Sequence, residues 1–116
     1  MLAFVLAGGC ITPSIPIPPP DPTEMNFHFT TVDGASTATF NYPADSNYCG
    51  GVAYLYDRNL MTGIIKHVNT DCTIGPMTMA ASLGDSVDFT VQTPTQTVST
   101  CVRLREGPQS PADYCQ

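Results

Sequence analysis

Cysteines carry the most distinctive chemistry in this sequence. The chain has 116 residues and five cysteines, one of which, Cys10, lies ahead of a proline-rich stretch. The other four follow that stretch, at Cys49, Cys72, Cys101 and Cys115. Four cysteines in so small a domain are typical of two disulfides formed in an oxidising compartment. We therefore predict a protein that folds outside the cytoplasm.

Histidines and methionines are the side chains that could hold a metal ion. His28 and His67 are the only histidines, and a zinc site would also need carboxylates or thiolates, of which the thiolates are used in the predicted disulfides. Thioethers suit Cu(I), so Met61, Met77 and Met79 with His67 could form a copper site. Met77 and Met79 also have the spacing of core residues on a strand. We predict no metal and no cofactor, and keep periplasmic copper binding as an alternative function.

Catalytic residues form no recognisable arrangement. Neither histidine lies in a Gly-x-Ser-x-Gly context, and no glycine-rich phosphate loop is present. Asp85 and Asp88 flank an expected tight turn, where carboxylates are solvated. A net charge of −6 with only four lysines and arginines argues against nucleic acid as a partner. We predict a protein that is not an enzyme, has no catalytic residues and binds no nucleic acid.

An apolar run ending in small residues precedes Cys10. The segment LAGGC, residues 6–10, resembles the lipobox of bacterial lipoproteins. The resemblance implies that residues 1–9 are a signal peptide remnant, and that Cys10 is lipidated and anchors the protein in a membrane. Ile11 follows the cysteine in place of the Asp that favours inner-membrane retention, which implies an outer-membrane lipoprotein facing the periplasm or the cell surface. The alternative is an N-terminal strand that buries Cys10.

Six of the eleven prolines lie between Cys10 and Met25. Proline lacks a backbone donor and favours the polyproline II conformation, which has no internal hydrogen bonds. We therefore expect residues 10–24 to be a disordered or polyproline linker. It would act as a semi-rigid stalk between the lipid anchor and a domain spanning residues 25–116.

From Met25 onward, apolar and polar residues alternate with period two, which is typical of strands with one buried side. Turn residues separate seven short segments: 25–30, 36–42, 50–57, 61–69, 76–83, 86–93 and 97–105. The segment 50–57 is apolar on both faces, which favours a central strand. Leu83 is expected to face inward at the end of its strand. The pattern predicts an all-β protein, an antiparallel β-sandwich of about seven strands.

The segment LGDSVDF, residues 83–89, resembles the corner between strands E and F of fibronectin type III and related immunoglobulin-like domains. Leu83 and Phe89 keep the six-residue interval between the leucine and the corner tyrosine of that family. The resemblance implies a sandwich of this architecture. Because the chain has no tryptophan, Phe40 or Tyr42 would fill the space of the tryptophan of the family's second strand.

Strand parity suggests how the cysteines pair. Cys101 is expected to share the outward face of its strand with Arg103 and Arg105, and its nearest partner along the chain is Cys115. We therefore predict Cys101–Cys115, which leaves Cys49 to pair with Cys72. Four cysteines allow three pairings, so the other two stay open at this point.

These features together predict a membrane-anchored extracytoplasmic binding or adhesion module of the bacterial cell envelope, with a protein or glycan partner. Tyrosines are common at interfaces. Tyr54 and Tyr56 lie in the aromatic segment 50–57, and Tyr48 lies just before it. We expect these tyrosines to contact the partner, although at least one of them should belong to the core. The alternative function is a structural accessory lipoprotein subunit of an envelope complex.

Overall fold

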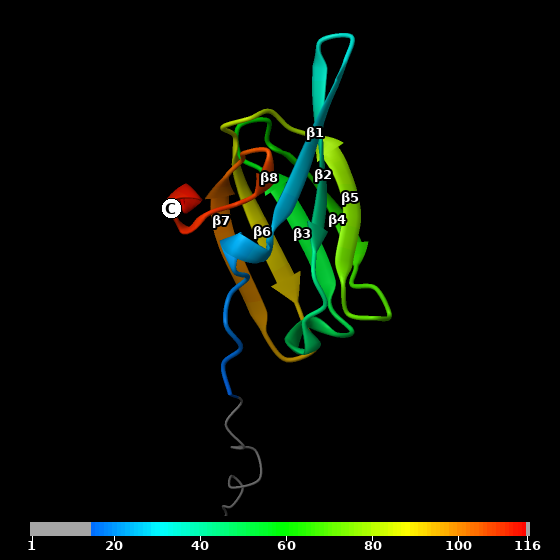
Figure 1. Cartoon of the computed structure of the whole chain (residues 1–116). Helices are drawn as coiled ribbons and strands as arrows, with labels where there is room; N and C mark the ends of the chain where they lie inside the picture. The colour runs from blue at the N-terminus through cyan, green and yellow to red at the C-terminus, as the bar shows by residue number, and fades with distance from the viewer. Residues whose placement is uncertain (1–14, 116) are drawn as a thin grey trace, which may run out of the picture.

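The fold is an antiparallel β-sandwich, as expected, of the general kind seen in immunoglobulin and fibronectin type III domains (Figure 1). A computed structural model describes residues 15–115 of the chain. The predicted signal peptide remnant, residues 1–9, and the predicted lipidation site Cys10 lie outside the described residues.

Two four-stranded sheets form the sandwich. The first sheet has the spatial order β5 (Ile74–Ala80), β2 (Ala35–Tyr42), β1 (Asn26–Val32) and β8 (Gly107–Pro108). The second has the order β4 (Thr62–His67), β3 (Val52–Asp57), β6 (Ser86–Gln92) and β7 (Thr97–Arg103). All seven predicted strands are present, and β3 is central, as predicted. The two-residue strand β8 is too short to show a period in the sequence.

Aromatic side chains from both sheets form the centre of the core. The ring centroids of Phe40 and Phe89 lie 4.6 Å apart, and those of Phe27 and Phe40 lie 4.8 Å apart. Tyr42 packs on Phe89 at 5.4 Å. These contacts join β1 and β2 to β6 across the sandwich, and such aromatic pairs add about 0.5–1.5 kcal/mol beyond their buried area. Phe40 and Tyr42 thus occupy the core, as expected for a chain without tryptophan.

Leu83 was expected to face inward, and this prediction is wrong. Strand β5 ends at Ala80, and Ala81 is the last buried residue before the turn to β6. The amide of Asp85 donates to the carbonyl of Ser82, and the amide of Ser82 donates to the Asp85 carboxylate. This tight turn lifts Leu83 out of the sheet, where its side chain is exposed. The six-residue interval from Leu83 to Phe89 therefore does not mark a buried corner pair, although Phe89 itself is buried.

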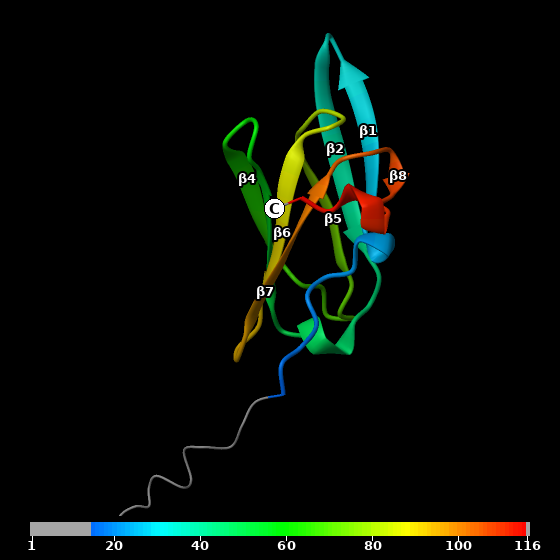
Figure 2. The ribbon, with the colours of Figure 1, turned by 90° about the vertical axis from the view of Figure 1, so that its left-hand side faces the viewer.

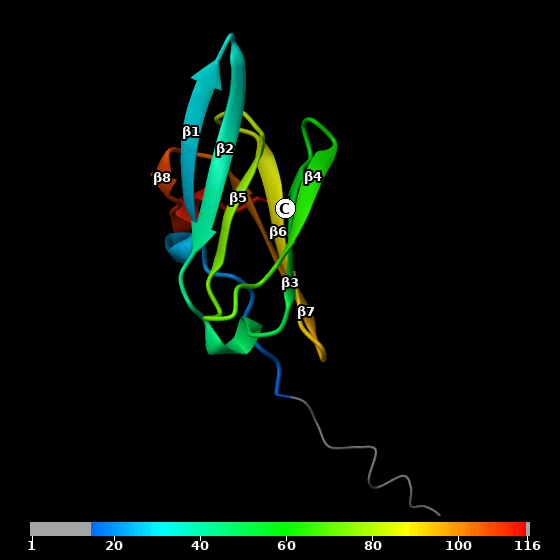
Figure 3. The same cartoon turned by 90° about the vertical axis from the view of Figure 1, so that its right-hand side faces the viewer.

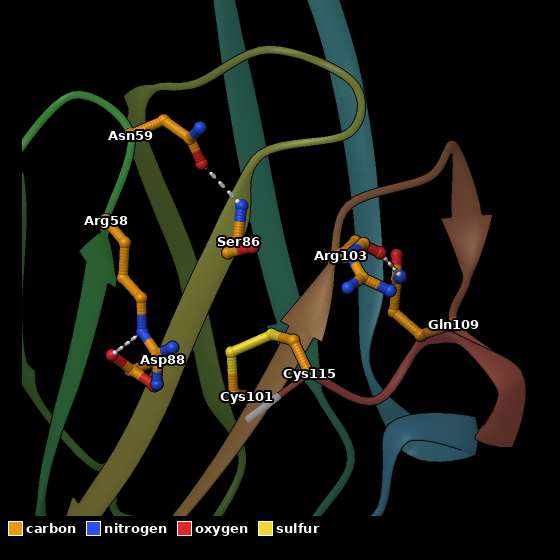
Figure 4. The surroundings of a disulfide bond; sticks show 8 residues. All are labelled: Arg58, Asn59, Ser86, Asp88, Cys101, Arg103, Gln109 and Cys115. Atoms are coloured by element: carbon orange, nitrogen blue, oxygen red, sulfur yellow. Dashed lines mark hydrogen bonds and ion pairs between the residues drawn. A yellow bond between two sulfur atoms is a disulfide. The ribbon is translucent and has the colours of Figure 1, made fainter.

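Both predicted disulfides are formed, Cys49–Cys72 and Cys101–Cys115. Cys101 lies on the outer side of β7 yet is nearly buried, because the C-terminal tail covers it (Figure 4). The amide of Cys115 donates to the Cys101 carbonyl at 2.9 Å, and Val102 forms a β-bridge with Tyr114. A short helix, η3 (Pro111–Asp113), precedes this contact. The tail therefore closes part of the outer edge of β7.

The proline-rich segment does not project as a free stalk over residues 15–24, which corrects the expected linker for that part. Figure 2 shows it running along the side of the sandwich next to β7. Pro20 and Pro22 are buried, and Ile17 packs against the core. The segment ends in the short helix η1 (Pro22–Glu24), which Asp21 caps. We call residues 15–24 the strap; residues 10–14 lie outside the described residues.

Side chains hold the strap through its backbone. Gln96 accepts from the amide of Ile17 (2.9 Å) and donates to the carbonyl of Ile15 (2.7 Å). Three further bonds follow along the strap, from Tyr48 Oη to the Pro18 carbonyl (3.0 Å), from Thr100 Oγ1 to the Pro20 carbonyl (2.7 Å) and from the Asp21 amide to Tyr42 Oη (3.0 Å). Prolines cannot donate to a strand ladder, but their carbonyls still accept from side chains. The strap therefore closes the side of the sandwich without adding a strand.

Candidate interaction surfaces

Tyr48 does not belong to an exposed contact surface, so its prediction as a contact residue is wrong. It lies in the short helix η2 (Ser46–Tyr48), and its side chain is buried. Its ring packs on Tyr42 at a centroid distance of 6.0 Å, and its hydroxyl donates to the strap. Tyr48 is thus the tyrosine of this group that belongs to the core. The turn residues around Tyr48 did not indicate that its side chain points into the core.

Tyr54 and Tyr56 lie together on the outer face of the second sheet. Tyr54 is half-buried, and its hydroxyl donates to Gln92 Oε1 at 2.7 Å. Tyr56 is 40% exposed. The strand register places Ile65 beside Tyr54 and Gly63 beside Tyr56. Ile65 is 68% exposed, so this part of the face combines aromatic and aliphatic surface.

The same face becomes polar toward β7. Asp88 lies opposite Tyr56 on β6 and accepts two bonds from Arg58, from Nε at 2.9 Å and from a terminal nitrogen at 2.7 Å (Figure 4). Thr90 and Ser99 share a hydroxyl–hydroxyl bond further along the face. The apolar part of the face is therefore confined to the side next to β4.

A second exposed apolar group lies at one end of the sandwich. The turns from β1 to β2, from β3 to β4 and from β5 to β6 all lie at the end opposite to the strap's first residues (Figures 1 and 3). Each turn carries exposed large apolar side chains, between 47% and 74% exposed. We call this group the apolar tip: Val32, Leu60, Met61 and Leu83.

Sequence reasoning missed the apolar tip because Leu83 was expected to face inward and Met61 was counted with the following strand. The sequence feature that could have indicated the tip was the presence of apolar residues within predicted turns. Turns usually carry Gly, Pro, Asn, Asp or Ser, whereas the turn between β3 and β4 contains Leu60 and Met61. Met61 has a positive φ of 57°, a region that bulky side chains rarely adopt.

Hydrogen bonds hold the tip in place. The amide of Arg58 donates to the Ser86 carbonyl (2.8 Å), and the amide of Ser86 donates to Asn59 Oδ1 (2.8 Å) (Figure 4). Asp57 Oδ1 accepts from the amides of Asn59 (2.8 Å) and Leu60 (3.0 Å). The β3–β4 turn is thus fixed both to its own strand and to the start of β6. Two of the three turns therefore present their apolar residues from a hydrogen-bonded base.

Asp57 is a buried carboxylate beneath the tip. Its side chain is inaccessible to solvent, and its Oδ2 atom has no hydrogen-bond partner within the described chain. Burial, followed by the neighbouring Asp85 carboxylate, raises the pKa of Asp57 to about 6, against the effect of the amides that donate to it. This carboxyl group therefore gains a proton more readily in the folded protein than in the unfolded chain.

A concave site of about 520 Å³ lies where the strap meets η2 and the C-terminal tail. It combines acidic and aromatic side chains: Asp21, Glu24, Asp45, Tyr42, Tyr48 and Tyr114. Burial raises the pKa of both Tyr42 and Tyr48, and nearby negative charge raises it further. Asp21 and Asp45 each accept from a backbone amide two residues later, as helix caps do. Capping therefore accounts for these two carboxylates.

The side chains considered for copper do not converge. Met77 and Met79 are buried in the core, whereas Met61 and His67 are exposed near opposite ends of β4. Within residues 15–115, no group of three or more His, Cys, Asp or Glu side chains could hold a metal ion. The same residues contain no helix long and apolar enough to cross a membrane.

The fold and its surfaces define a small, acidic, disulfide-bridged β-sandwich, in which most of the exposed large apolar side chains lie on one sheet face or at one end. No protein-family model, curated protein or solved structure matches the chain. Because many unrelated functions share the sandwich architecture, function has to be argued from the surfaces themselves.

Proposed function

We propose that this chain is a membrane-anchored extracytoplasmic binding module of the bacterial cell envelope, without enzymatic activity. A lipid on Cys10 would hold it at the outer membrane, facing the periplasm or the cell surface. The lipobox-like LAGGC segment supports the anchor. The two disulfides support an oxidising compartment, because such bonds are rare in the cytosol.

The apolar tip is the observation that carries the proposal. The strap begins at one end of the sandwich, and the tip lies at the other (Figures 1 and 3). A domain tethered through its N-terminus would therefore present Val32, Leu60, Met61 and Leu83 away from the anchor. Large exposed apolar patches mark interaction sites, and we infer that these side chains, which lie at the same end of the sandwich, contribute to one.

The chemistry of the tip favours a protein partner with a complementary apolar surface. Aliphatic side chains and a methionine make up the tip, and methionine adapts its shape to irregular surfaces. Tyr54 and Tyr56 on the adjoining sheet face would extend the contact with side chains that are common in interfaces. A glycan would need polar and aromatic contacts, so it would fit the tyrosine face better than the tip.

The anchor is tested by intact mass spectrometry of the protein from membranes of its native host, without reduction. We expect a chain that begins at Cys10, carries acyl groups and lacks the four protons removed by two disulfides. An unmodified chain beginning at Met1 would contradict the anchor and would leave Cys10 as a free thiol or an intermolecular bridge.

Binding through the tip is tested by cross-linking in the envelope followed by purification. We expect the double variant L60E/M61E to lose the cross-linked partner seen with the unchanged protein. The control is Thr70→Glu, an exposed position in the loop between β4 and β5, at the other end of the sandwich, which should keep the partner. Equal cross-linking by all three proteins would contradict the tip as the binding site. A constant, stoichiometric complex that survives solubilisation would favour the accessory-subunit function.

A further inference from the structure

Three outer strands of the two sheets are shielded along their exposed edges. β8 has only two residues, one of them Pro108, and β7 is covered by the C-terminal tail and the strap. On β5, Pro76 has no amide to donate, and its carbonyl accepts from Lys66 Nζ at 3.1 Å. Natural proteins shield edge strands in these ways because unpaired edges recruit other strands.

The outer edge of β4 has no such cover within the described chain. The amide of Val68 donates to the Gly51 carbonyl, which makes these residues a hydrogen-bonded pair of the β3–β4 ladder. Because such pairs alternate along an antiparallel ladder, the even-numbered residues of β4 bond to β3. The backbone groups of Gly63, Ile65 and His67 therefore point away from the sheet, and these residues make no backbone bond outside their strand among those of the described residues.

This edge is self-complementary. Ile65 is the middle one of the three outward-pointing residues and is 68% exposed. If two β4 strands lie antiparallel about Ile65, Gly63 faces His67 of the other copy, and Ile64 faces Lys66. No two like charges are then opposite each other, and β4 carries no acidic residue in a chain of net charge −6. Lys66 is bonded toward the first sheet, which keeps its ammonium group away from the edge.

We propose that β4 pairs with β4 of a second copy of this chain, antiparallel and centred on Ile65. Such a contact has closed two-fold symmetry, in which the same residues face each other from both sides. It joins the two second sheets into one continuous sheet and brings Tyr54 and Ile65 of both copies onto one face. The two apolar tips would then lie at opposite ends of the pair. This inference is independent of the proposed function.

The test measures self-association of the full chain with both disulfides formed and with Cys10→Ser to prevent intermolecular bridging. Sedimentation equilibrium should show a monomer–dimer equilibrium at concentrations below roughly 1 mM, the range of weak specific contacts. Ile65→Lys places two ammonium groups at the two-fold axis, and we expect it to weaken the dimer by at least about tenfold, equivalent to about 1.4 kcal/mol. The matched control Thr78→Lys, at an exposed site on β5, should leave the dimer unchanged.

Amide hydrogen exchange distinguishes strand pairing from other contacts. We expect the amides of Gly63, Ile65 and His67 to become protected as the concentration of the unchanged protein rises, and to stay unprotected in the Ile65→Lys variant. Equal urea midpoints for the Ile65→Lys and Thr78→Lys variants would show that both remain folded. A monomer throughout this concentration range would overturn the proposal. So would a dimer that tolerates Ile65→Lys, that is equally weakened by Thr78→Lys, or that leaves these three amides unprotected.

Discussion

β7 and β4 are the two edge strands of the second sheet, but within the described chain only β7 is covered by other segments. Beside β7, the strap from before the first strand and the tail from after the last strand cover the sheet. Beside β4, the outward-pointing backbone of Gly63, Ile65 and His67 has no cover within the described chain. The difference indicates that the strap and the tail close one side of a small core, whereas on the other side β4 and β5 adjoin without a covering segment from the described residues.

The closed side relies on segments with almost no regular structure of their own. Two side chains of β7 and its preceding turn, Thr100 and Gln96, hold the strap by its backbone, and the Cys101–Cys115 bond fixes the tail. Small domains bury a limited apolar area, so such cross-links contribute a large share of the free energy of unfolding. The comparison between the two sides can be tested by changing each of them in turn.

The largest effect is expected from removing the bridge on the closed side. In the chain-entropy model a loop of about 15 residues stabilises by about 3 kcal/mol, so C101A/C115A should lower the free energy of unfolding by about that amount. The tail should also loosen and expose the β7 edge. Urea unfolding under non-reducing conditions measures the first effect, and sedimentation measures the second. An unchanged urea midpoint with no added self-association would contradict the expectation that the tail stabilises the fold and covers the β7 edge.

The next effect concerns Asp57, at the turn that leads into the open β4 edge. The pKa of Asp57 is raised from 3.8 to about 6 in the folded protein. Protonation therefore stabilises the fold fully below about pH 4, and this contribution is lost as the pH rises through about 6. Asp57→Asn keeps the acceptor for the Asn59 and Leu60 amides but cannot ionise.

We therefore expect the unchanged protein to lose up to about 3 kcal/mol of unfolding free energy relative to the Asp57→Asn variant between pH 4 and pH 7, since each pKa unit corresponds to about 1.4 kcal/mol. Urea unfolding of both proteins across this range measures the difference. Parallel pH curves for the two proteins would show that Asp57 titrates alike in the folded and unfolded states.

The smallest effect is expected from a single bond between the strap and the sheet. Thr100→Val keeps the shape of the buried side chain but leaves the Pro20 carbonyl without its donor. A buried acceptor without a partner costs about 1–3 kcal/mol, and we expect the lower part of that range because neighbouring bonds hold the strap. Thr62→Val on exposed β4 should change stability by less than about 0.5 kcal/mol. Thermal or urea unfolding measures the stability of both variants. Equal losses of unfolding free energy would contradict the proposal that the strap contacts stabilise the β7 edge more than the exposed β4 edge is stabilised.

Local patterns were sufficient to predict the strands and the disulfides. Period-two alternation identifies a half-buried strand because successive side chains point to opposite faces, and it located five of the seven longer strands. The segment 50–57 was predicted from apolar residues on both faces, and the segment 61–69 had no definite inward face. The outward parity of Cys101, together with the nearness of Cys115 in the sequence, led to the correct pairing. Leu83 shows the limit of this reasoning, because alternation continues past the point where the turn at Ser82 ends the strand.

The sequence by itself determined the all-β sandwich and the central position of β3, since both depend on the pattern of apolar residues within short stretches. For the disulfides it favoured one of three pairings, which the structure then confirmed. Only the tertiary structure decided that the proline segment docks as a strap, that Tyr48 is buried and that the three turns with exposed apolar residues lie at the same end. The physical reason is distance along the chain. Three of the strap's hydrogen bonds join residues 79 to 81 positions apart, and no local pattern of apolar residues indicates which distant side chain will bond to a proline carbonyl.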